Sequence, residues 1–109
     1  MHEGRWQLLD TDPAWAGNRS HDALIAFAWS GPGGRRRLVA VNYADHPSQG
    51  FVRLPWDDLA GRDWYLRDRL GPARYERDGT DLAARGLYLD LPAWGCCAFE
   101  VQRIRGGLP

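Results

Sequence analysis

Short apolar or alternating runs follow one another along the chain, and glycine, proline and aspartate separate them at short intervals. This spacing is typical of an antiparallel sandwich or barrel. No window of the chain has the 3.6-residue periodicity of an amphipathic helix, and no internal repeat is present. The pattern therefore predicts an all-β fold, an antiparallel Greek-key β-sandwich of about eight strands.

The first expected strands are residues 5–9, 23–29 and 38–43. The run at 23–29 is apolar at consecutive positions, as expected of a strand flanked on both sides. A Gly- and Arg-rich turn separates it from residues 38–43, which are therefore its predicted hairpin partner. Further short strands are expected at 51–55, at 63–68 and within 71–79, where an Asp-Gly turn closes the last of them, and single helical turns are considered in 56–62 and 80–85.

The end of the chain holds the clearest period-two pattern. In residues 86–92, Leu87, Leu89 and Leu91 point one way, and Pro92 is expected to end the strand because it has no N–H group. A final strand over 96–103 places Cys97, Phe99 and Val101 on one face and Cys96, Ala98 and Glu100 on the other.

The two adjacent cysteines, Cys96 and Cys97, are the first candidates for chemistry. Adjacent residues in a strand point to opposite faces, so the two thiols cannot bind one metal ion while the strand is extended. A zinc ribbon needs a C-x2-C spacing and a second ligand pair. We therefore expect Cys97 to be a small buried side chain and Cys96 to lie on the opposite face.

The length and net charge of the chain limit the number of domains and the kinds of partner that we expect. The 109 residues are expected to form one domain, a sandwich over about 4–103 with a loose tail at 104–109. The formal net charge is zero, which disfavours nucleic acid and acidic membranes as partners. No apolar run could span a bilayer and the first residues lack the build of a signal peptide. We therefore expect a cytoplasmic protein, or a piece cut from a larger one.

Other polar groups have simple structural interpretations. His2, His21 and His46 match no metal motif, and the paired aspartates in turns are typical of caps and Asx-turns. The arginines of residues 33–37 are expected at a solvated hairpin tip. The sequence predicts no catalytic group, no metal site and no cofactor.

Six tryptophans are an unusually large number for this length. Trp29 and Trp64 fall within expected strands and are assigned to the core. Trp15, Trp56 and Trp94 lie in expected loops, where indole rings could stack on sugar rings or seal the domain against a partner. These three are the candidate carbohydrate-binding or interdomain residues, and both interpretations stay open.

Three segments in order carry a resemblance: LVAVNYADHPSQGFVRLP, WYLRDRLGPARYERDG and GLYLDLPAWGCCAFEV. Together they resemble the C-terminal β-sandwich domain of glycoside hydrolase family 13, the α-amylase family, over residues 2–103. In that family the domain follows a catalytic (β/α)8 barrel. The nucleophile, the acid/base and the third carboxylate lie on loops of the barrel, and no stretch of this chain matches those motifs.

The resemblance implies a non-catalytic accessory domain of an enzyme that acts on α-glucans. Its expected partner is the barrel of the parent chain, which it would cover and stabilise. The apolar face left on an isolated domain would favour a homo-oligomer. The alternative is a carbohydrate-binding module that contacts α-glucan through exposed tryptophans.

Overall fold

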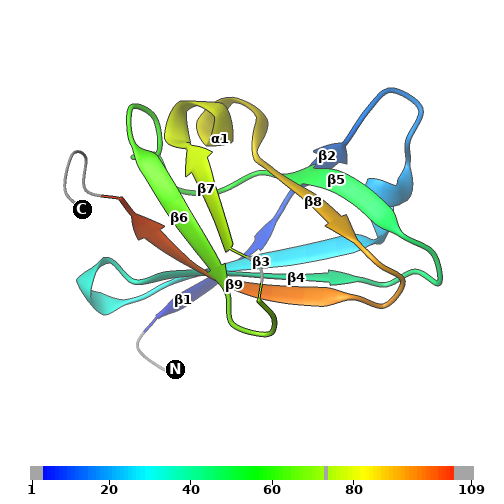
Figure 1. Cartoon of the computed structure of the whole chain (residues 1–109), viewed down its shortest axis with the longest axis horizontal. Coiled ribbons are helices and arrows are strands. Elements are labelled where there is room, and N and C mark those ends of the chain that lie inside the picture. The colour runs from blue at the N-terminus through cyan, green and yellow to red at the C-terminus, as the bar shows by residue number, and fades with distance from the viewer. Residues whose placement is uncertain (1–3, 73, 105–109) are drawn as a thin grey trace.

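A computed structural model describes residues 4–72 and 74–104 of the chain. In these ranges nine β-strands form two sheets, and one short α-helix lies between the seventh and eighth strands (Figure 1). Every strand pairing is antiparallel. The predicted all-β sandwich is confirmed.

The larger sheet has six strands in the order β1-β3-β4-β9-β6-β7. Their bounds are β1 Arg5–Leu9, β3 Leu24–Ser30, β4 Arg36–Asn42, β9 Cys96–Arg103, β6 Asp63–Asp68 and β7 Arg74–Asp78. The smaller sheet has the order β2-β5-β8, formed by Thr11–Pro13, Ser48–Val52 and Leu87–Leu91. The last strand of the chain, β9, lies between β4 and β6, so it ties the two halves of the larger sheet together.

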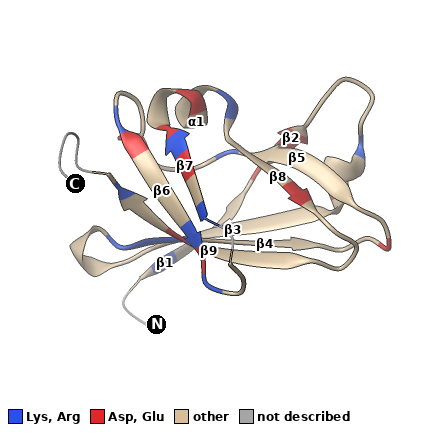
Figure 2. Ribbon diagram, in the orientation of Figure 1, with Lys and Arg blue, Asp and Glu red and all other residues tan. Residues whose placement is uncertain are grey.

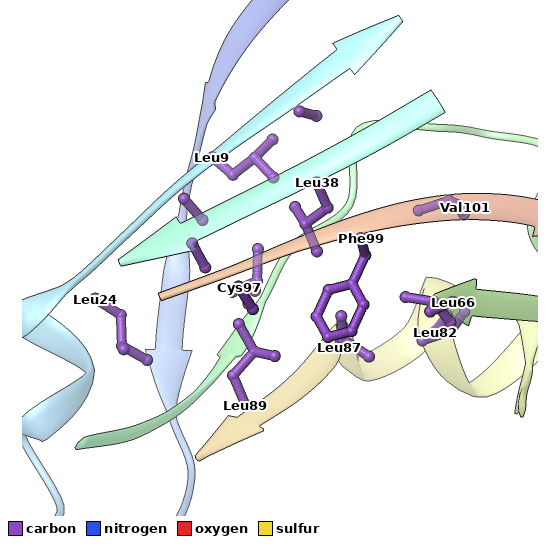
Figure 3. Close-up of a cluster of buried hydrophobic side chains, with 14 of the residues drawn as sticks. Leu9, Leu24, Leu38, Leu66, Leu82, Leu87, Leu89, Cys97, Phe99 and Val101 are labelled. Carbon is purple, nitrogen blue, oxygen red and sulfur yellow. The ribbon is translucent and has the colours of Figure 1, made fainter. Parts of the chain in front are cut away.

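The space between the sheets is filled by aliphatic side chains from every second position of the strands. Leu38, Leu66 and Leu87 are almost fully buried there, and Figure 3 shows Phe99 from β9 in the same cluster. Both faces that were expected to point inward, one on β8 and one on β9, belong to this core: Leu87, Leu89, Leu91, Cys97, Phe99 and Val101. Period-two patterning therefore located the core correctly in the last two strands.

Three expectations about local structure were wrong in whole or in part. The strand expected at 51–55 is β5, which runs over Ser48–Val52 instead. Residues 56–62 form no helical turn. The strand β7 ends at Asp78 as expected, but Asp78 and Gly79 begin a helix and not a simple turn. The Asp78 carboxylate accepts a hydrogen bond of 2.9 Å from the Thr80 amide and caps the helix α1, Gly79–Arg85, so the helical turn considered at 80–85 is confirmed.

Two further elements lie between the strands expected at 5–9 and 23–29. β2, Thr11–Pro13, pairs with β5, and a 3-10 helix covers Ser20–Ala23. At the other end of the chain, the amide of Ile104 donates to the carbonyl of Asp63 over 2.9 Å, which extends the pairing of β9 with β6 by one residue. The rest of the expected tail, 105–109, lies outside the described residues.

Candidate functional site

The outer face of the six-stranded sheet carries a row of apolar side chains across four strands. Leu8 of β1 is opposite Phe27 of β3, Phe27 is opposite Val39 of β4, and Val39 is opposite Ala98 of β9. Directly opposed residues of an antiparallel pair lie on the same face and touch. The row is turned away from the core, because the neighbouring positions Leu9 and Ala26 point inward.

A second row lies beside the first. It is formed by Ile25, Val41 and Cys96, which oppose one another across β3, β4 and β9. Trp6, two positions before Leu8 in β1, adds an exposed indole to the same face. We call this surface the apolar face and define it by both rows and this indole: Trp6, Leu8, Ile25, Phe27, Val39, Val41, Cys96 and Ala98.

The apolar face is open to solvent where its side chains are largest. Leu8 is 67% exposed and Phe27 38% exposed. The same face of the sheet becomes charged beyond β9, where Arg67 of β6 is opposite Glu100 and Arg74. Figure 2 shows tan ribbon along β3 and along the parts of β4 and β9 that lie beside it, with red and blue segments on β6 and β7, at the start of β4 and toward the end of β9. A contiguous exposed apolar surface with a charged border is the mark of an interaction site.

Trp29 belongs to this outer face and not to the cluster between the two sheets. It follows Phe27 by two positions in β3, so both side chains point outward, and its ring is buried against Gly4 and Gly31 with the Arg37 guanidinium 5.4 Å from its centre. Trp29 is therefore buried as expected, but on the outer face of the sheet and outside the cluster between the two sheets. A strand position gives the direction of a side chain but not what covers it. Trp64, the other strand tryptophan, is in the core as expected.

The three predicted site tryptophans do not form one platform. Trp15 and Trp94 are 56% and 63% exposed, and both lie in loops at the end of the sandwich where β3 and β5 begin. Trp56 lies at the opposite end, beside the β3–β4 tip. It packs against the core, and its indole nitrogen donates a hydrogen bond of 2.9 Å to the Ser30 hydroxyl. The structure thus places Trp15 and Trp94 at one end and Trp56 at the other.

Arg36, at the start of β4, is not the solvated tip residue expected from the sequence. Its guanidinium carbon lies 5.3 Å from the ring centre of Trp56 and 5.1 Å from that of Trp64. Its Nη2 donates to the Asp58 carboxylate over 2.7 Å. This hydrogen bond is the main reason why the pKa of Asp58 lies below its usual value, with the positive charge of Arg36 acting in the same direction. Arg35, by contrast, is exposed as expected.

The histidines and cysteines do not converge. His21 contacts its neighbour Asp22 at 3.3 Å, while His46 lies in the loop after β4 and His2 is outside the described residues. Cys96 is exposed and Cys97 buried, on opposite faces as predicted. Burial, and secondarily the charge of Asp68, raises the pKa of the Cys97 thiol to about 12. Among residues 4–72 and 74–104, no three His, Cys, Asp or Glu side chains are grouped closely enough to hold a metal ion.

The resemblance implies an exposed apolar face on an isolated domain, but sequence reasoning did not locate its residues, although their signal was present. The run at 23–29 is apolar on both faces, and this was read only as a strand lying between two others, which β3 is. The second apolar side of β3 is part of the outer face of the sheet, which no other element covers in the described residues.

No helix of the described part of the chain is both long and apolar enough to cross a membrane. No protein-family model matches this chain, and no curated protein matches it either.

Proposed function

We propose that this chain is a non-catalytic accessory domain that docks on a second domain through the apolar face. The proposed partner is the catalytic (β/α)8 barrel of an α-amylase-family enzyme acting on α-glucans, as the sequence resemblance implies. The observation that carries the docking role is the continuous row from Leu8 through Phe27 and Val39 to Ala98.

Burial of this face would supply a substantial driving force. Fully burying one leucine or phenylalanine side chain is worth roughly 1.5–3 kcal/mol. Leu8 and Phe27 gain only part of that in the isolated domain because both remain exposed. The sheet would then become the middle layer of the assembly, with the β2-β5-β8 sheet on one side and the partner on the other.

The self-association of the isolated chain tests the docking role. With a reductant present, so that Cys96 cannot cross-link, light scattering after gel filtration should show concentration-dependent oligomers. The double variant Leu8→Ser, Phe27→Ser should be monomeric and bind less of a hydrophobic dye. Tyr88→Ser, on the exposed face of the smaller sheet, is the matched control and should behave as the wild type. A monomeric wild type that binds no dye would contradict the proposal.

The nature of the partner is tested separately, by the genomic sequence before the codon for Met1. An in-phase reading frame coding for a (β/α)8 barrel would support an α-amylase-family parent. An unrelated coding region in that place would contradict this identity and leave the docking surface to another partner.

One observation favours the alternative, a carbohydrate-binding module. Trp15, Trp94 and Tyr43 are all more than half exposed in loops at the same end of the sandwich, and the amide of Trp94 bonds to the carbonyl of Ala44, next to Tyr43, over 3.0 Å. Titration with maltoheptaose, followed by tryptophan fluorescence with cellohexaose as the control sugar, tests it. Saturable binding lost in Trp94→Ala would favour the module, and no shift up to millimolar sugar would count against it.

A further inference from the structure

The six-stranded sheet opens between β4 and β9. Their pairing ends where Arg37 is opposite Glu100, whereas β9 continues to Arg103 against β6 alone. Beyond this point β4 stays with β3, since Arg36 is opposite Ser30. Figure 1 shows the β3–β4 tip turned away from the end of β9. Beyond Glu100, β9 therefore has a paired strand on one side only. The main-chain groups of Val101 and Arg103 point to the other side, because those of Gln102 face Tyr65 of β6.

A groove of about 730 Å³ occupies this opening. One wall is the hairpin tip from Gly33 to Arg37, and the other is the end of β9 from Glu100 to Arg103. Neither Gly33 nor Gly34 would bring a Cβ atom within 4 Å of another group, so the tip side is open. The volume is in the range of pockets that hold small ligands.

The groove is lined by more positive than negative groups. Four arginines, Arg35, Arg36, Arg37 and Arg103, line it, against two carboxylates, Asp58 and Glu100. Both carboxylates already have arginine partners: Asp58 is 2.7 Å from Arg36, and Glu100 is 3.2 Å from Arg69, which is outside the groove. The lining therefore favours an acidic ligand.

We infer that this groove binds an acidic, extended segment of a partner protein, which adds as a short strand to the free side of β9. Its main chain would pair with Val101 and Arg103, whose N–H and C=O groups point away from β6, and its carboxylates would pair with Arg35 and Arg103. This inference does not depend on which domain covers the apolar face.

The lining favours a peptide over other anions. A free inorganic anion could use the arginines but would leave the open side of β9 without a main-chain partner. A single nucleic-acid strand would need exposed rings on which its bases could stack, and the one tryptophan in the lining, Trp64, is buried in the core. The Arg36 side chain is fixed between Trp56 and Trp64, so this wall is already formed before a ligand binds.

The test uses the whole chain and a six-residue peptide of alternating glutamate and threonine, blocked at both ends. Amide NMR shifts should change saturably at Val101, Gln102 and Arg103. The double variant Arg35→Gln, Arg103→Gln should weaken binding by roughly tenfold or more. The control Arg19→Gln, Arg85→Gln removes the same charge from residues that do not line the groove and should bind as the wild type.

Two further probes separate strand addition from simple charge attraction. The same peptide with alternate backbone amides methylated keeps its charge but lacks the N–H groups that pair with β9, and it should bind at least tenfold more weakly. Equal binding of the methylated peptide, or of inorganic phosphate and citrate at the same residues, would overturn the inference in favour of a small-anion site. Absence of any shift with the acidic peptide at millimolar concentration would overturn the site itself.

Discussion

The side-chain amide of Asn42 donates a hydrogen bond of 3.0 Å to the carbonyl of Pro92, fifty residues away in the chain. The same nitrogen lies 3.2 Å from the carbonyl of Leu91 and 2.9 Å from that of His46, and the Asn42 side-chain oxygen accepts from the Ala44 amide. Asn42 is fully buried. One side chain thus joins the end of β4, the following loop and the link between β8 and β9.

Replacement of Asn42 by alanine should lower the free energy of unfolding by about 3 kcal/mol, because it leaves buried main-chain groups without partners. Asn42→Asp should be at least as harmful, since it keeps the acceptor for Ala44 but removes the donor and buries a charge. Urea denaturation measures both. A loss below about 1 kcal/mol for Asn42→Ala would contradict this role.

Gly86 and Gly17 provide a matched pair of glycine substitutions. Both have left-handed backbone conformations, with φ of 88° and 84°. A Cβ on Gly86, which ends α1, would collide with the carbonyl group of Val52, whereas a Cβ on Gly17 would meet nothing within 4 Å. Gly17→Ala should therefore cost only about 1 kcal/mol and Gly86→Ala roughly 3 kcal/mol or more by thermal or urea unfolding. Equal costs would show that the Val52 contact relaxes freely.

The two thiols should react at very different rates. Cys96 is exposed, while Cys97 is buried with a pKa raised to about 12, so almost none of its reactive thiolate is present at neutral pH. A chromogenic disulfide reagent at pH 8 should titrate one thiol per native chain quickly, and the second only in denaturant. Cys96→Ser should abolish the fast phase. Rapid reaction of both thiols in the native wild type would contradict the burial of Cys97.

The raised pKa of Cys97 also predicts how stability depends on pH. The native thiol keeps its proton up to pH of about 12, whereas the unfolded thiol loses it near its model value of 9.0. The contribution is therefore fully present below pH 9 and is lost as the pH rises from 9 toward 12, by up to about 1.4 kcal/mol per pH unit. Since tyrosines also titrate in this range, the measurement is the difference between the wild type and Cys97→Ala, which should have a flatter profile.

The apolar face and the core should respond differently to substitution. In the isolated chain at low concentration, Phe27→Ser should change the free energy of unfolding by no more than about 1 kcal/mol, because the side chain is already exposed in part. Leu38→Ala, a neighbour on the inner face, should cost 2–5 kcal/mol as a fully buried leucine. Denaturant unfolding curves of the two variants measure both changes in the free energy of unfolding. A loss for Phe27→Ser as large as that for Leu38→Ala would show that the outer face is already packed.

The sequence predicted best where alternation was regular. The leucines of β8 and the inward residues of β9 follow period two, so their faces were correct. β2 was missed because three residues that include Pro13 are too short for any periodicity to show. The helical turn considered at 80–85 agrees with α1, although seven residues are too few for helical periodicity to show; the Asp78 side chain that accepts a hydrogen bond from the Thr80 amide marks the start of this helix.

The candidate site was predicted less well than the strands, for a different physical reason. Alternation shows which way a side chain points, but it does not show which element covers it. For that reason the burial of Trp29 was predicted but not the face on which it is buried, and the outward side of Ile25 and Phe27 was not predicted to be a surface. The groove was beyond sequence reasoning because it depends on where β4 and β9 separate.

The apolar face is assembled from both ends of the chain, since Leu8 and Ala98 belong to one row. Its parts come together only after β9, the last strand made, has paired with β4. A partially folded chain has the same side chains but not this arrangement of them. A partner that recognises the whole face would therefore bind only fully folded domains. Such binding would select folded chains over partially folded ones.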